Sequence, residues 1–192
     1  MRNDDKGFTI IEIVVVIAIL GLLATMLIGS TSYIANSAAR GLANSVKTAI
    51  GETRIKTMGK QETVLYIYRS SEDDKFYKQY IVKINDNWQK PEMEETIGKR
   101  NPVFRYQIKG DATIHELTPG TGIFIGFDRA TGKETTVSDI KVDIDGASGK
   151  LVEYTGGGTV YESIICENIE ITGGGSMYNV KIVPATGKVT LE

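Results

Sequence analysis

The feature that most constrains the fold is an apolar run near the N-terminus, residues 8–28. Only four residues in it are not hydrophobic, namely Thr9, Glu12, Gly21 and Thr25. As a helix these 21 residues would be about 31 Å long, close to the thickness of the hydrocarbon core of a bilayer. Because apolar side chains would occur on every side of this helix, we expect a transmembrane helix rather than a soluble amphipathic one.

Two simpler interpretations of this run remain open. A secretory signal peptide would be removed near Ser30 or Ala39, but its apolar region would exceed the usual length of roughly 7–15 residues, and no Ala-x-Ala site follows closely. An uncleaved membrane anchor would be oriented by Arg2 and Lys6 on the cytoplasmic side. Neither interpretation explains Glu12, because a carboxylate inside an apolar membrane segment is costly and usually marks a functional position.

The spacing of Thr9 and Glu12 allows a local explanation of the carboxylate. Thr-x-x-Glu is the pattern of a helix capping box, in which the two residues hydrogen-bond each other's backbone N–H groups. This interpretation is compatible with a membrane helix, so both remain open for Glu12.

The stretch from Lys6 to Glu12, with Gly7 and Phe8 before the apolar run, resembles the N-terminus of type IV prepilins and the related pseudopilins. The resemblance implies that a membrane prepilin peptidase cleaves between Gly7 and Phe8 and methylates the new amino group of Phe8. Glu12 would then be the fifth residue of the mature chain. The resemblance further implies that its carboxylate helps to recruit the incoming subunit by pairing with an N-terminal ammonium group.

The leader, residues 1–7, departs from the more basic leaders of that family, because Asp4 and Asp5 offset Arg2 and Lys6. The whole chain has 22 basic and 24 acidic side chains and a net charge of -2. This balance provides no strong field to attract nucleic acid or anionic lipid.

From residue 29 to residue 59 the pattern becomes that of an amphipathic helix with one narrow apolar stripe. Gly59 is a stop signal, so a continuous helix from Phe8 to Met58 would be about 75 Å long. Its second half needs a sheet to cover the stripe, which consists of Ile34, Ala38, Leu42, Val46 and Ile50.

Residues 60–192 show the alternation of apolar and polar residues that is typical of β-strands, and no second helix is expected there. The fold class is therefore α+β, with a long N-terminal helix that carries a mostly antiparallel β-sheet or sandwich domain. Most pilin-like proteins combine these two parts. The predicted strands are 64–68, 80–84, 103–108, 123–127, 140–144, 169–171, 178–182 and 189–191.

The C-terminal part also resembles, more specifically, the H-type pseudopilins and related minor pilins. The similarity lies in a strand at 124–127, a glycine turn at 130–132, and two closing strands around a second such turn at 185–188. It implies a β-sandwich packed on the helix and a role in filament initiation.

Nothing in the sequence indicates an enzyme or a cofactor. Ala-Thr-Gly-Lys, at 130–133 and 185–188, lacks the earlier glycine and the following Ser or Thr of a phosphate-binding loop, so we expect two similar hairpin turns. His115 is the only histidine, which excludes a histidine-rich metal site. Cys166 is the only cysteine and is expected to be a small buried residue, whereas Trp88 has no assigned role.

Two ligand hypotheses have weaker support. Asp139, Asp143 and Asp145 offer oxygen atoms that suit calcium, but their spacing does not match an EF-hand, and a solvated strand face explains them more simply. A contact with DNA is the second hypothesis, although an ordinary charged surface fits the near-neutral balance better. It rests on a modest basic group near Tyr106, formed by Lys99, Arg100, Arg105 and Lys109.

Together these observations predict a structural filament subunit in four parts: a leader (1–7), a transmembrane and filament-core helix (8–28), an amphipathic helix (29–59) and a β-rich domain (60–192). The expected partners are prepilin peptidase, other pilin or pseudopilin subunits and the cell membrane, which the chain would cross once with its C-terminal domain outside.

The alternative is a membrane-tethered β-domain binding module that never polymerises. The two hypotheses differ over Gly7 and Glu12, because a filament subunit requires both residues and a tether requires neither.

Overall fold

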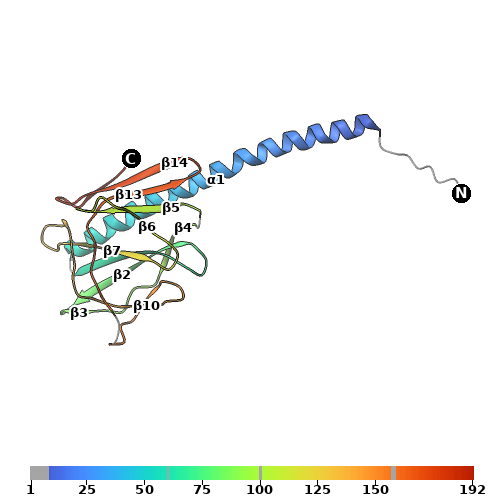
Figure 1. The fold of residues 1–192 in the computed structure, drawn as a ribbon. Coiled ribbons are helices and arrows are strands. Elements are labelled where there is room, and N and C mark those ends of the chain that lie inside the picture. Colours follow the sequence, from blue (N-terminus) through green and yellow to red (C-terminus); the bar gives the residue numbers. More distant parts are fainter. Residues whose placement is uncertain (1–8, 60, 100, 157–158) are drawn as a thin grey trace.

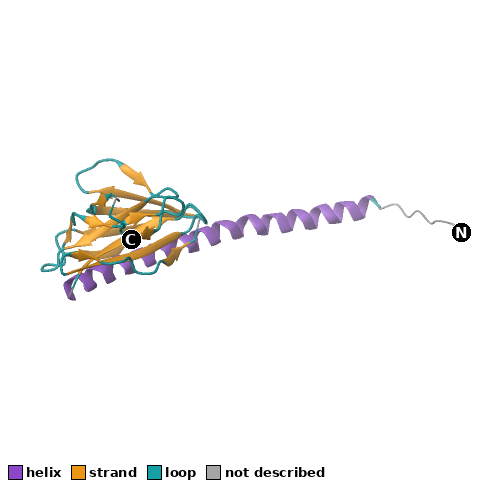
Figure 2. Ribbon diagram, turned by 90° about the horizontal axis from the view of Figure 1, so that it is seen from below, coloured by secondary structure: helices purple, strands orange, loops and turns teal. Residues whose placement is uncertain are grey.

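The structure is a computed structural model that describes residues 9–59, 61–99, 101–156 and 159–192. In these residues a single α-helix, α1 (Ile10–Gly59), is followed by short strands that form the β domain. The second half of α1 packs against this domain, and the first half projects well beyond it (Figures 1 and 2). The predicted α+β fold is confirmed, and the helix ends at Gly59 as expected.

The first sheet has the strand order β3-β2-β1-β7-β8, and its pairs are all antiparallel. Strand β4 pairs with the N-terminal end of β2, and β3 pairs with its C-terminal end. The central strand β1 pairs with β2 along its whole length, with Glu62 opposite Lys83 and Arg69 opposite Phe76. The strands are β1 (Glu62–Arg69), β2 (Phe76–Ile84), β3 (Asn87–Trp88), β4 (Glu95–Gly98), β7 (Gly122–Phe127) and β8 (Glu134–Thr135).

The second sheet is also antiparallel and has the order β15-β14-β13-β5-β6. Its strands are β5 (Val103–Ile108), β6 (Ile114–Glu116), β13 (Cys166–Gly173), β14 (Ser176–Val183) and β15 (Lys188–Leu191).

Two hydrophobic clusters lie on the opposite faces of the first sheet. The larger cluster joins α1 to both sheets, and alternate residues of β1, Leu65 and Ile67, point into it. The other alternate residues, Val64, Tyr66 and Tyr68, point into the second cluster, which is covered by residues 137–151. Strand β1 is therefore buried on both faces, as its almost continuously apolar sequence indicates.

One predicted strand is wrong in detail. Residues 140–144 do not form a single strand but split into β9 (Ile140–Lys141), which pairs with β12 (Val160–Tyr161), and β10 (Asp143–Ile144), which pairs with β11 (Leu151–Val152). Ile140 and Val142 both point into the second cluster. The predicted alternation of buried and exposed residues is therefore present, although the strand that pairs with this segment changes between the two residues.

The predicted apolar stripe on α1 is buried at Leu42, Val46 and Ile50 but not at its start. Ile34 is 56% exposed, whereas Leu42 is 1% exposed. Successive fourfold steps rotate by about 40° around a helix of 3.6 residues per turn, so a stripe spaced strictly by four drifts off the buried face. The face that packs on the sheets instead mixes steps of three and four, through Ala39, Leu42, Ala43, Val46, Ala49, Ile50, Thr53 and Thr57.

The turn between β13 and β14 brings the second sheet against the backbone of α1. A Cβ atom on Gly173 would lie 2.7 Å from the carbonyl oxygen of Ala35, and one on Gly174 would collide with the carbonyl oxygen of Ser32. Gly174 also has a φ of 61°, which side-chain-bearing residues rarely adopt. Glycine at this turn therefore allows the sheet to approach the helix directly.

Candidate functional site

The first half of α1 exposes apolar side chains on every side. Ile10 is 82% exposed, and the large hydrophobic residues from Ile11 to Leu23 are all at least half exposed. In Figure 2 the segment extends away from the β domain, so no other described part of the chain covers it. A continuous apolar surface of this kind marks a site of interaction with another protein or a membrane. It consists of Ile10, Ile11, Ile13, Val14, Val15, Val16, Ile17, Ile19, Leu20, Leu22 and Leu23.

Glu12 is the one acidic residue on this surface, in the first turn of α1. Its Oε2 accepts hydrogen bonds from the backbone N–H of Thr9 at 2.8 Å and from the Thr9 hydroxyl at 2.9 Å. The backbone N–H of Glu12 donates in return to Thr9 Oγ1 at 3.3 Å. The capping box is thus confirmed, and it leaves the carboxylate exposed at the end of the helix, where a cation from another chain can reach it.

The other predicted site residues, Gly7 and Phe8, lie outside the described residues. Their expected roles in cleavage and methylation therefore stay predictions from the sequence.

Residues 2–28 match the family described as the prokaryotic N-terminal methylation motif. The chain resembles type IV pilin-like proteins, and this match supports that family. The matched segment contains Gly7, Phe8 and Glu12, and it supports a substrate of prepilin peptidase. No curated protein and no solved structure gives a significant match to the chain. The H-type subtype is not confirmed.

Within the described residues, no helix has the combination of length and apolar character required of a membrane span. The transmembrane role expected for residues 8–28 is thus not shown by the structure.

The aspartates considered for calcium do not come together as a metal site. Asp143 accepts hydrogen bonds from the backbone and hydroxyl of Thr155, and Asp145 accepts them from the turn at Ala147 and Ser148. Among the described residues no group of three or more acidic, histidine or cysteine side chains is placed to hold a metal ion.

One member of the basic group considered for DNA is paired with acidic side chains. Arg105 lies 3.4 Å from a carboxylate oxygen of Glu116 and 3.6 Å from one of Glu170. The ring of Tyr106 stacks on His115, with 5.3 Å between the ring centroids. Arg100 lies outside the described residues.

The two Ala-Thr-Gly-Lys segments form matching turns, as predicted. Gly132 and Gly187 both have a φ of 64°, and each donates its backbone N–H to the carbonyl of the fourth residue before it. Arg54 of α1 donates its Nε–H to the carbonyl oxygen of Gly132 at 3.0 Å. These turns anchor the end of the helix to both sheets and resemble a phosphate-binding loop in sequence only.

Sequence reasoning missed a buried acid, Glu134, at the junction of the two sheets. Its Oε1 accepts the backbone N–H of Cys166 at 2.8 Å, and its Oε2 has no hydrogen-bond partner among the described residues. Burial raises the pKa of this carboxyl group from 4.5 to about 7, although the N–H of Cys166 and the charge of Lys109 oppose the shift. Its burial could not be predicted from the sequence, because a glutamate after a hairpin turn is ordinarily exposed.

Proposed function

We propose that this chain is a subunit of a type IV pilus or a type II secretion-like filament, as a minor pilin or pseudopilin. The observation that carries the proposal is the uncovered apolar surface of α1 from Ile10 to Leu23, which lies within the matched methylation motif. Packing these segments together in a filament core would remove their side chains from water, which is the main driving force for association.

In this proposal the chain first enters the cell membrane through residues 8–28, with the β domain outside. Prepilin peptidase then cleaves between Gly7 and Phe8 and methylates the amine of Phe8. The subunit leaves the membrane as it is added to a surface or periplasmic filament.

Glu12 would supply the electrostatic part of assembly. Inside an apolar core an isolated carboxylate is costly, but an ammonium about 4 Å away would attract it by roughly 4 kcal/mol at an effective dielectric constant of about 20. Within the described part of the chain, the hydrogen bonds to the exposed carboxylate come from Thr9 alone, so we expect that a new N-terminal amine can take over as its partner.

The decisive experiment is mass spectrometry of the N-terminus of the protein purified from its native membranes. A mature chain that begins at N-methylated Phe8 supports the filament subunit. An intact leader, in cells with an active prepilin peptidase, favours the membrane-tethered module, and a start near Ser30 or Ala39 indicates a secreted domain.

Glu12→Gln tests the assembly step separately. The amide keeps a hydrogen-bond acceptor for Thr9 but cannot carry a charge, so we expect a folded β domain and a loss of filaments by about tenfold or more. Glu167→Gln is the matched control, since Glu167 is an exposed acid on β13. Normal filament yield from the Glu12 variant would contradict the proposed role of the carboxylate.

A further inference from the structure

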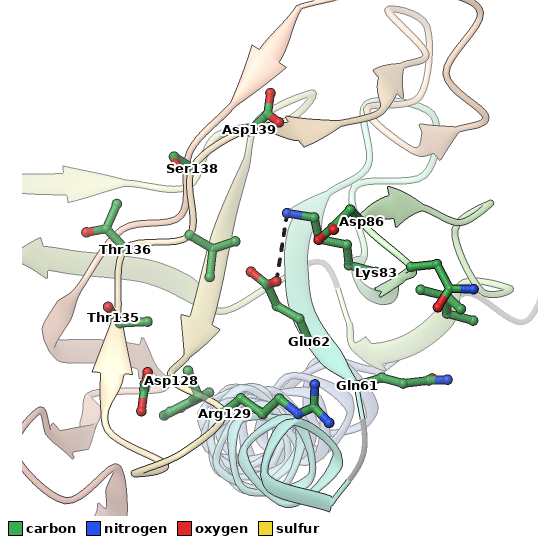
Figure 3. Close-up of a pocket in the computed structure, with 14 residues that line it drawn as sticks. Gln61, Glu62, Lys83, Asp86, Asp128, Arg129, Thr135, Thr136, Ser138 and Asp139 are labelled. Atoms are coloured by element: carbon green, nitrogen blue, oxygen red, sulfur yellow. Dashed lines mark ion pairs between the residues drawn. The ribbon is translucent and has the colours of Figure 1, made fainter.

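A polar cleft lies at the end of the β domain that is farthest from the free half of α1. Its volume is about 880 Å³, within the range of known ligand sites. Figure 3 shows Glu62 and Lys83 on one side of it and the segment from Thr135 to Asp139 along the other. Gln61 and Glu62 follow the C-terminal end of α1, so the cleft lies away from the exposed apolar segment of the helix.

The walls of the cleft are held in fixed conformations. On one side, Asn85 and Asp86 have φ values of 50° and 61° and form the tight turn between β2 and β3. On the other side, Val137 exchanges two hydrogen bonds with Ser163, at 2.7 and 2.9 Å. Asp139 has a φ of 65°, and its carbonyl accepts the indole N–H of Trp88. This last bond ties the two walls together, so the site is preorganised.

Asp86 occupies a position that ordinarily favours glycine. In two-residue hairpin turns with positive φ at both positions, the second residue is most often glycine, which adopts this conformation without strain. Asp86 has this backbone conformation although it carries a side chain, and such backbone strain tends to occur at functional sites.

Charges of both signs face the cleft without partners. Among the described residues, no hydrogen bond or ion pair involves the side chains of Arg129, Asp86 or Asp139. The single ion pair between lining residues joins Lys83 to Glu62 at 3.9 Å, near the limit for such a contact. The cleft therefore offers a cationic group and anionic groups that are free to bind a ligand.

The main chain along one wall adds neutral donors and acceptors. Between β8 and β9, the backbone N–H and C=O groups of Thr136 and Ser138 make no hydrogen bond to another described residue. Both residues line the cleft. An extended chain that binds beside such a segment can pair with its backbone.

The lining chemistry discriminates between classes of ligand. Four acids and two bases line the cleft, which disfavours nucleic acids and other polyanions. Phe127 is the single aromatic residue among them and is 1% exposed, so no ring is available to stack on a sugar. We propose that this cleft binds an extended polypeptide segment of another protein, with Arg129 holding an acidic side chain and Asp86 and Asp139 holding a basic one.

The test uses the full chain in detergent micelles and a set of fluorescent decapeptides of serine and glycine. Each peptide contains one lysine and one glutamate, and the set covers every pair of positions that these two residues can occupy. We expect binding to peak at one lysine–glutamate spacing and polarity, because the charged groups of the cleft are fixed in space. Arg129→Gln and Asp139→Asn should each weaken that binding by about tenfold, as expected for the loss of one charge-assisted bond.

Matched controls isolate the cleft from general charge effects. Arg40→Gln removes an exposed arginine from α1, and Glu167→Gln removes an exposed acid from β13. Neither should change the binding. No binding at peptide concentrations up to about 1 mM, equal binding at all spacings, or equal losses in the control variants would overturn the proposal. Binding of a neutral oligosaccharide in place of the peptides would also overturn it.

Discussion

Glu134 provides the sharpest test of the tertiary structure, because burial has changed its proton affinity. The side chain is 5% exposed, and its pKa is raised from 4.5 to about 7. Between these two pH values the folded protein binds a proton that the unfolded chain has released. The slope of the unfolding free energy with pH follows the protons bound by the unfolded state minus those bound by the folded state, so stability falls as the pH rises.

The magnitude follows from the size of the shift. From 4.5 to about 7 the change is about 2.5 pH units, and each unit corresponds to 1.36 kcal/mol, so the expected loss is about 3 kcal/mol. The loss is complete above the folded-state pKa. Asp73 and Asp111 affect stability in a more acidic pH range. Hydrogen bonds lower the pKa of each carboxyl group to about 2, so their stabilising contributions are lost only in stronger acid.

The measurement is urea unfolding of the full chain in detergent, followed through Trp88, at pH values from 4 to 8. The wild-type protein should lose about 3 kcal/mol of unfolding free energy between pH 4.5 and 7. Glu134→Gln should remove this slope, because the amide cannot ionise but can still accept the N–H of Cys166. The variant should therefore exceed the wild type in stability above pH 7.

Glu167→Gln is the matched control, because it removes an exposed acid beside Cys166 and should leave the slope unchanged. The burial argument is refuted if the wild-type stability is flat or rises across this range, or if the slope survives in Glu134→Gln.

Two further predictions test how α1 meets the sheets. Gly174→Ala should destabilise the protein by about 1–3 kcal/mol or more, because the methyl group meets the carbonyl of Ser32 and the φ is positive. Gly175 also has a positive φ, but a methyl group there would meet no other atom, so Gly175→Ala reports the backbone strain alone. Comparing the thermal unfolding of the two variants therefore separates the effect of the collision with α1 from that of the strain. Leu42→Ala should lower the free energy of unfolding in urea by about 2–5 kcal/mol, because Leu42 is buried. Ile34→Ala should lower it by less than about 0.5 kcal/mol, because Ile34 is exposed. Equal losses in the two variants would contradict the buried face described above.

The sequence by itself determined the elements that depend on local pattern. The apolar run, the Thr9–Glu12 spacing and Gly59 predicted a capped helix that ends where α1 ends. Alternation predicted the main strands of both sheets, and the two Ala-Thr-Gly-Lys segments predicted two similar hairpin turns. Such features could be predicted because their physical causes lie within a few residues of one another.

Only the tertiary structure decided which surfaces meet. It showed that the predicted stripe leaves the buried face of α1 at Ile34, and that residues 140–144 divide between two partners. The burial of Glu134 and the cleft beside Asp139 likewise arise from segments far apart in the chain. A side chain's exposure and proton affinity depend on everything packed around it, and that environment exists only once distant segments have come together.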